Sequence, residues 1–132
     1  MEVAIGQIGA PAAPIEATAS RDTVEPARGT DEAIVRSYFR DIPIMAEIAR
    51  CESNFRHTVR DGSVLRGRVD PADTGIMQIN RRYHEDQAVA MGLDLADIYH
   101  NMAYARYLYE TQGVQPWSAS APCWRSEVAI KE

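Results

Sequence analysis

The strongest constraint in this sequence is a glutamate that continues the apolar face of a predicted helix. Met45, Ile48 and Glu52 stand at positions i, i+3 and i+7, so they share one helix face. A carboxylate on that face is either desolvated or turned towards a cleft. Both desolvation and the negative end of the helix dipole oppose ionisation, so we expect a raised pKa for Glu52. A carboxylic acid that stays protonated near neutral pH can act as a general acid.

A second carboxylate, Asp73, stands just ahead of a compact apolar run at residues 75–80, Gly-Ile-Met-Gln-Ile-Asn. Cleavage of a glycosidic bond commonly uses two carboxylates in different environments. The alternative is that Asp73 is a turn residue or a cap for the following segment and has no chemical role.

Composition narrows the classes of protein and partner. The chain has 132 residues, 45% of them hydrophobic, which fits one domain with a core and a tail. A net charge of −5 argues against nucleic acid or an anionic membrane as partner. No apolar run is long enough to span a bilayer. The first residues do not look like a signal peptide, which leaves a mature form, another export route or an intracellular protein.

The two cysteines, Cys51 and Cys123, allow two interpretations. In a reducing compartment they would be free thiols packed as small hydrophobic residues. In an exported protein they would pair and tie the end of the Glu52 helix to the C-terminal tail. A metal site is not expected, because there is no Cys-x-x-Cys and the histidines are scattered. No cofactor motif is present, so we expect no cofactor.

The order of elements predicts an α+β fold that is mainly α. Residues 1–28 are rich in Ala and Pro without periodicity and are expected to be a flexible tail or linker, and residues 29–132 the folded domain. The expected helices are a short one capped by Thr30 and Asp31, one opened by Pro43, one at 85–91 and one from about 97 to 113. Between them we expect a small β-hairpin or irregular β excursion around 60–73 and a buried segment at 75–80 read as a helical turn. An irregular aromatic tail is expected at 116–124.

Three segments in order resemble the lysozyme superfamily. Residues 48–55, Ile-Ala-Arg-Cys-Glu-Ser-Asn-Phe, look like the Glu-Ser motif of soluble lytic transglycosylase domains and animal-type lysozymes. Residues 75–80 look like their Gly-Leu-Met-Gln-Ile motif, and residues 101–108 are similar to the helix that follows in transglycosylases. The likeness covers about 44–124 and implies a lysozyme-like catalytic domain.

Two branches of that superfamily share different features with this chain. Asp73 before the apolar run is similar to animal-type lysozymes, where the aspartate is the second catalytic carboxylate. Cys51 before Glu52, with Pro116-Trp117 before Cys123, looks like the resuscitation-promoting factors, which are secreted wall enzymes. The second likeness implies a Cys51–Cys123 bridge and an extracellular or periplasmic protein. One departure is that residues 118–124 replace the Ala-Tyr-Asn-Ala-Gly run of transglycosylases, so the role of its tyrosine is unassigned.

The resemblance implies roles for particular residues. Glu52 is the expected general acid and base, and Asp73 the second carboxylate if the enzyme is lysozyme-like. The expected substrate-binding residues are Ser53, Gln78, Asn80, Asn101, Tyr104, Tyr107 and Trp117. Several have plainer alternatives: Asn101 can orient other residues of the cleft, some tyrosines must belong to the core, and Trp117 can pack under the tail.

The expected activity is cleavage of peptidoglycan glycan strands between N-acetylmuramic acid and N-acetylglucosamine by a monomer. A lytic transglycosylase would form a 1,6-anhydro end with Glu52. A lysozyme-type muramidase would hydrolyse the same bond with Glu52 and Asp73. The rivals are a non-catalytic sugar-binding module on the same fold and a structural protein that docks through its apolar tail.

Overall fold

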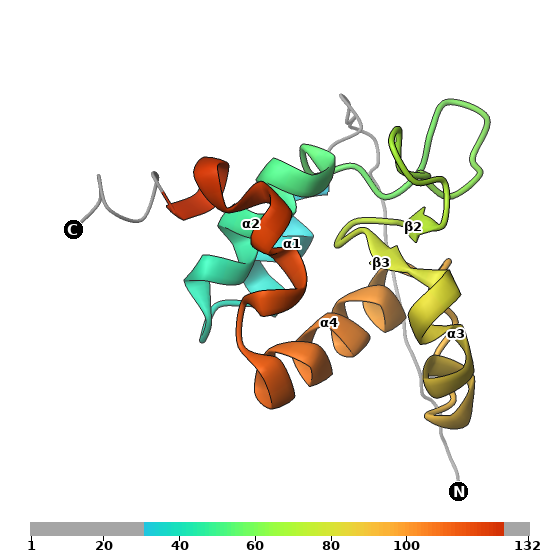
Figure 1. Ribbon diagram of the computed structural model, residues 1–132. Helices are drawn as coiled ribbons and strands as arrows, with labels where there is room; N and C mark the ends of the chain where they lie inside the picture. Colours follow the sequence, from blue (N-terminus) through green and yellow to red (C-terminus); the bar gives the residue numbers. More distant parts are fainter. Residues whose placement is uncertain (1–30, 126–132) are drawn as a thin grey trace, which may run out of the picture. The chain divides into compact units, whose positions relative to one another are not determined.

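The computed structural model describes residues 31–125, which are mainly helical with one small antiparallel sheet (Figure 1). The α+β, mainly α, class predicted from the sequence is therefore correct. The predicted tail at 1–28 lies outside the described residues. Within residues 31–125, no helix has the length and apolar character needed to cross a membrane.

Helix α1 (Glu32–Tyr38) packs against α2, to which a short connection joins it. Val35 and Phe39 are fully buried. The expected side-chain cap from Asp31 is wrong: its carboxylate accepts a hydrogen bond from the His57 backbone N–H at 3.2 Å instead. Asp31 therefore ties the start of α1 to the segment that follows α2, whereas Thr30 lies outside the described residues.

Helix α2 (Pro43–Ser53) has Pro43 in its first turn, where no intrahelical N–H is lost. The helix ends at Asn54, which takes a left-handed conformation with a φ of 55°. Met45 and Ile48 are fully buried, and Glu52 is half-buried on the last turn. The predicted apolar stripe is thus present and leads to the glutamate.

The sheet is displaced from its predicted position. β2 (Asp73–Thr74) pairs with β3 (Ile79–Asn80), with Asp73 opposite Asn80. The 60–73 region holds only isolated bridges, Thr58 with Val64 and Arg66 with Thr74, so it forms the irregular β excursion and not the hairpin of the two alternatives. The helical turn expected at 75–80 is wrong, because Gly75 and Gln78 have φ of 77° and 52° and these left-handed residues reverse the chain into a hairpin.

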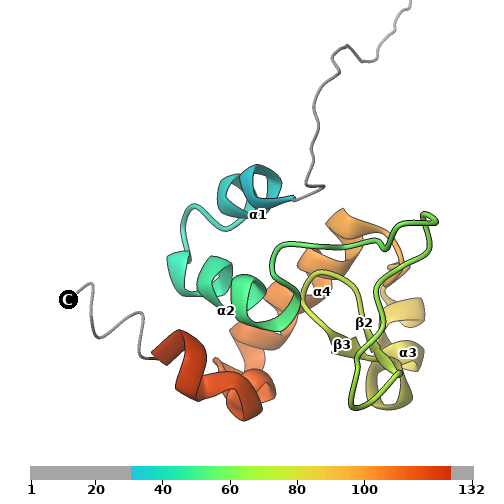
Figure 2. The ribbon, with the colours of Figure 1, turned by 90° about the horizontal axis from the view of Figure 1, so that it is seen from above.

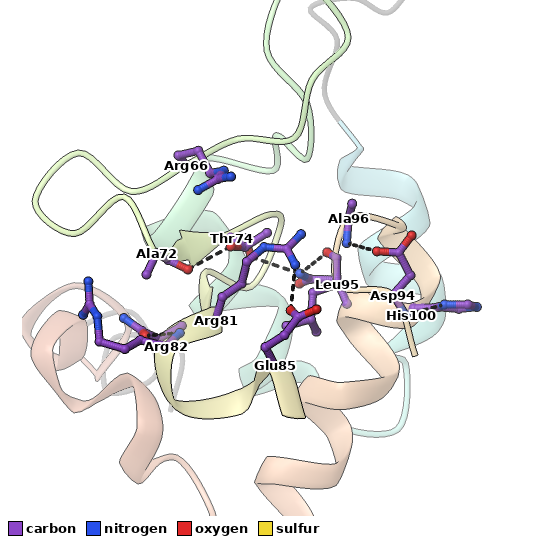
Figure 3. A network of polar contacts seen from close by, with 12 residues as sticks. Arg66, Ala72, Thr74, Arg81, Arg82, Glu85, Asp94, Leu95, Ala96 and His100 are labelled. Atoms are coloured by element: carbon purple, nitrogen blue, oxygen red, sulfur yellow. Dashed lines mark hydrogen bonds and ion pairs between the residues drawn. The ribbon is translucent and has the colours of Figure 1, made fainter. Parts of the chain in front are cut away.

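Two capped helices follow the sheet. α3 (Arg81–Ala90) begins four residues before the predicted start, because Asn80 caps it by accepting a hydrogen bond from the Arg82 N–H. Arg81 and Glu85 form an ion pair at 2.7 Å along its first turn (Figure 3). α4 (Ile98–Gln112) begins after the cap Asp97 and ends at Gly113, as predicted.

The C-terminal segment is helical, so the prediction of an irregular tail is wrong. η2 (Gln115–Ser120) is a 3-10 helix with Pro116 in its first turn, and residues 121–125 continue as helix. The segment returns to lie beside α2 (Figures 1 and 2). Trp117 and Trp124 are buried there. The core beneath α2, α4 and the hairpin turn contains the fully buried side chains of Met45, Ile48, Ile76, Met77, Met102 and Leu108.

Candidate active site

The side chain of Glu52 is held by the C-terminal segment. The Ser120 hydroxyl donates a hydrogen bond to Glu52 Oε2 at 2.6 Å, across 68 residues of sequence. Ser120 is itself fixed, because its oxygen accepts from the Trp124 indole N–H at 3.0 Å. One carboxylate oxygen of Glu52 is therefore bound inside the protein.

Burial is the main influence on the ionisation of Glu52. Loss of water around the carboxyl raises the pKa of Glu52 above its ordinary value, the Ser120 hydrogen bond lowers it, and the negative charge of Asp73 raises it. The net shift is upward. This is the direction expected from the sequence, and it favours the protonated acid.

Asp73 is the second carboxylate, and its charge acts on Glu52. It stands on β2, and its Oδ1 accepts a hydrogen bond from Asn80 Nδ2 at 2.9 Å. Asn80 also donates to Asp70 at 2.9 Å, so one amide links two carboxylates. The structure thus brings Glu52 and Asp73 within electrostatic reach of each other and gives them different partners.

A cavity of about 280 Å³ lies beside Asp73. Six of its lining residues are Asp73, Gln78, Asn80, Tyr83, His84 and Trp117. Glu52 is not among the lining residues. Two lining residues act on Glu52. Trp117 is linked to it through Ser120, whose hydroxyl lies 3.1 Å from the Trp117 carbonyl oxygen, and Asp73 acts on it through its negative charge. Tyr83 and His84 could not be predicted as site residues, since no motif in the sequence includes them.

Gln78 lies at the end of the hairpin turn and lines the cavity. Its Nε2 donates to the Gly75 carbonyl at 3.0 Å, which holds the side chain. Within residues 31–125 no group donates to its Oε1. That oxygen can accept a hydrogen bond from a ligand hydroxyl or amide.

The turn beneath the cavity is supported by Asn101, which is fully buried. Its Nδ2 donates to the carbonyls of Thr74 and Leu95, and its Oδ1 accepts from the Met77 N–H. Both amide hydrogens are used inside the fold. Asn101 is therefore placed to orient the turn, not to contact substrate.

A buried histidine, which the sequence did not single out, supports the same turn. His57 Nδ1 accepts from the Ile76 N–H at 3.0 Å, and its Nε2 lies 2.6 Å from the Ala96 carbonyl oxygen. Because an N–H only donates and a carbonyl only accepts, the proton lies on Nε2 and the ring is neutral. Long-range contacts of this kind leave no local pattern in a sequence.

The other predicted substrate-binding residues are mostly internal. Ser53 is buried and donates to the Ala49 carbonyl at 3.0 Å. Tyr104 is buried, with its hydroxyl 3.0 Å from His84 Nδ1, and its ring packs against Tyr107. The Trp117 indole donates to the Met77 carbonyl at 2.9 Å, so this side chain joins η2 to the turn while it also lines the cavity.

A disulfide joins Cys51 to Cys123. Cys51 directly precedes Glu52, and Cys123 follows Ser120 by three residues. The bridge therefore ties the segment that carries the Ser120 hydroxyl to α2, which carries the Glu52 carboxyl. Among the described residues no group of three or more His, Cys, Asp or Glu could hold a metal ion.

The geometry provides a raised-pKa acid, a nearby ionisable carboxylate and an adjoining cavity with a polar amide. These groups can donate a proton to a leaving oxygen beside a stabilised positive charge. Comparison with known proteins adds nothing to this: no protein-family model matches the chain, and neither a curated protein nor a solved structure matches it.

Proposed function

We propose that this protein is a lytic transglycosylase with a lysozyme-like fold, acting on peptidoglycan between N-acetylmuramic acid and N-acetylglucosamine. The observation that carries the proposal is the half-buried Glu52, whose pKa is raised and whose carboxyl accepts a hydrogen bond from Ser120 on η2 and feels the charge of Asp73. The resemblance of residues 48–55, 75–80 and 101–108 to transglycosylases supplies the substrate class.

The reaction uses Glu52 twice. Its proton passes to the glycosidic oxygen, and the C1–O bond breaks with its electron pair going to that oxygen. The C6 hydroxyl of the same muramic acid unit bonds to C1 and returns its proton to Glu52. No water is consumed, and the product has a 1,6-anhydro end.

A lysozyme-type muramidase is the second candidate, and Asp73 is the observation that favours it. Asp73 lines the cavity and its charge acts on Glu52. In that mechanism Asp73 stabilises or traps the cation at C1, and water completes hydrolysis. The disulfide supports an oxidising location outside the cytoplasm for either enzyme. We propose that either enzyme acts as a monomer.

Mass spectrometry of digested peptidoglycan separates the two activities. Anhydro-muramic ends support the transglycosylase, whereas only reducing ends refute it in favour of hydrolysis. Asp73→Asn should leave anhydro product formation within about tenfold of wild type but stop hydrolysis.

The variant Glu52→Gln tests catalysis itself. We expect it to lower the rate by about 10²–10⁴-fold, the usual contribution of a positioned acid. The exposed Glu110→Gln on α4 is the matched control and should retain full activity. If the wild type cleaves nothing and Glu52→Gln binds wall fragments as tightly as the wild type does, the protein is a sugar-binding module instead.

A further inference from the structure

We propose that Ser120 is a positioning residue that occupies Glu52 Oε2, so that the catalytic proton is carried on Oε1. This inference rests on the proposed function and extends it to a residue outside the recognised motifs. Ser120 stands where the chain departs from the transglycosylase pattern, at 118–124, and that departure is the sequence signal for it.

The Ser120 hydroxyl has one hydrogen and two possible acceptors. Glu52 Oε2 lies at 2.6 Å and the Trp117 carbonyl oxygen at 3.1 Å. The carbonyl already accepts from the Trp124 indole N–H at 3.2 Å. The same N–H also approaches Ser120 Oγ at 3.0 Å and occupies one of its lone pairs. The hydroxyl hydrogen is therefore directed at Glu52, which is the closer and, once ionised, the stronger acceptor.

This arrangement makes the two oxygens of Glu52 unequal. Oε2 accepts the Ser120 hydrogen bond, whereas within residues 31–125 no group donates to Oε1. The proton therefore belongs on Oε1, which in the proposed reaction is the oxygen that gives it to the glycosidic oxygen. When Oε1 gives up that proton, the carboxylate becomes charged and the Ser120 bond becomes charge-assisted, so it is stronger in the transition state than before it.

Other charged groups on the packed elements do not replace this contact. η2 contributes no charged side chain, and Arg125 on the next turn lies over the Trp124 ring. On α1, Arg36 is paired with Glu32 and Glu47. The charge that acts on Glu52 comes from Asp73 on β2.

The test combines kinetics on peptidoglycan with ¹³C NMR titration of the Glu52 carboxyl in the full, disulfide-bonded protein. Its resonance is assigned by its absence in Glu52→Gln. Ser120→Ala should lower kcat by about 10- to 100-fold with KM unchanged, as expected for a lost hydrogen bond to a charged group. It should also raise the pKa of Glu52, because the bond that lowers it is gone. Ser120→Thr keeps the hydroxyl and should restore both properties.

Two further variants sharpen the result. Trp124→Phe removes the indole N–H, leaves the Trp117 carbonyl open to the hydroxyl, and should raise the pKa of Glu52 less than Ser120→Ala does. It also serves if Ser120→Ala does not fold. The exposed Ser118→Ala, on the same 3-10 helix, is the control and should change neither property.

An unchanged pKa of Glu52 in both Ser120→Ala and Trp124→Phe overturns the inference, as does an effect on stability alone. The titration needs no turnover, so it decides the role of Ser120 even if the wild type cleaves no peptidoglycan. Absence of cleavage by the wild type would refute only the proposed function.

Discussion

Replacing Gly75 by alanine is the sharpest test of the buttress beneath the site. A Cβ at Gly75 would lie 2.6 Å from Asn101 Nδ2 and 2.7 Å from His57 Cε1. Both neighbours are buried and hydrogen-bonded, so neither can give way without losing a bond. Gly92 has the same φ of +77° with nothing within 4 Å of the added Cβ, which makes Gly92→Ala a matched control.

Gly75→Ala and Gly92→Ala share the free-energy cost of a left-handed alanine, but only Gly75→Ala also introduces steric overlap. Left-handed strain of about 1–2 kcal/mol, offset by about 0.4–1 kcal/mol of unfolded-state entropy, applies to both. Gly75→Ala adds overpacking of about 1–3 kcal/mol and weakens at least one buried hydrogen bond worth about 1–3 kcal/mol. We therefore expect Gly92→Ala to lose about 1 kcal/mol and Gly75→Ala about 3–5 kcal/mol, a large part of a typical domain's stability.

Urea unfolding followed by tryptophan fluorescence measures both free energies, with equal m-values as the check on two-state behaviour. Trp117 and Trp124 are both buried next to the site, so they report its loss. Adding Asn101→Ala to Gly75→Ala should recover about 1 kcal/mol or more as a coupling energy. If the two glycine variants agree within about 0.5 kcal/mol, the contacts of Asn101 and His57 do not constrain the turn and the reasoning is wrong.

The remaining predictions concern the bridge and the ionisation of the acid. Replacing Cys51 and Cys123 together by serine should lower the free energy of unfolding by about 4 kcal/mol, which is the entropic value for a loop closed across 72 residues. Urea unfolding without reductant measures this loss, and a loss under about 1 kcal/mol would contradict the prediction. In the proposed mechanism Glu52 must be protonated, so kcat/KM should fall as pH rises through its raised pKa. Asp73→Asn removes a charge that raises this pKa and should move the falling limb to lower pH, and an opposite shift would refute the electrostatic coupling. The native state holds the Glu52 proton more tightly than the unfolded state does, so stability should decline as pH rises from the ordinary to the raised pKa of Glu52. Glu52→Gln should abolish this contribution to the decline and be more stable than wild type at pH values above the raised pKa. Thermal unfolding measured across pH tests both expectations.

The helices were predictable because their signals are local. Pro43 opens α2, Asp97 caps α4, and the spacing of Met45, Ile48 and Glu52 places the acid on the last turn of α2. The start of α3 was missed because Asn80 was read as part of an apolar segment and not as its cap.

The hairpin was misplaced for a different reason. Gly75 signals a turn, but a left-handed glutamine at position 78 cannot be read from residue type, since most non-glycine residues avoid that conformation. Gln78 is held there by its bond to Gly75 and by the packing of Ile76 and Met77. Asn101 was placed on the correct helix, whereas its role as an internal support depends on three bonds to distant segments.

Local pattern was sufficient to make Glu52 a candidate acid, because periodicity and a helix end are properties of neighbouring residues. Its actual chemical state follows from groups that folding brings from far along the chain: the Ser120 hydroxyl, the charge of Asp73 and the burial beneath the C-terminal segment. The pKa of a carboxyl depends on everything around it in space, so no spacing rule along the chain can supply those partners.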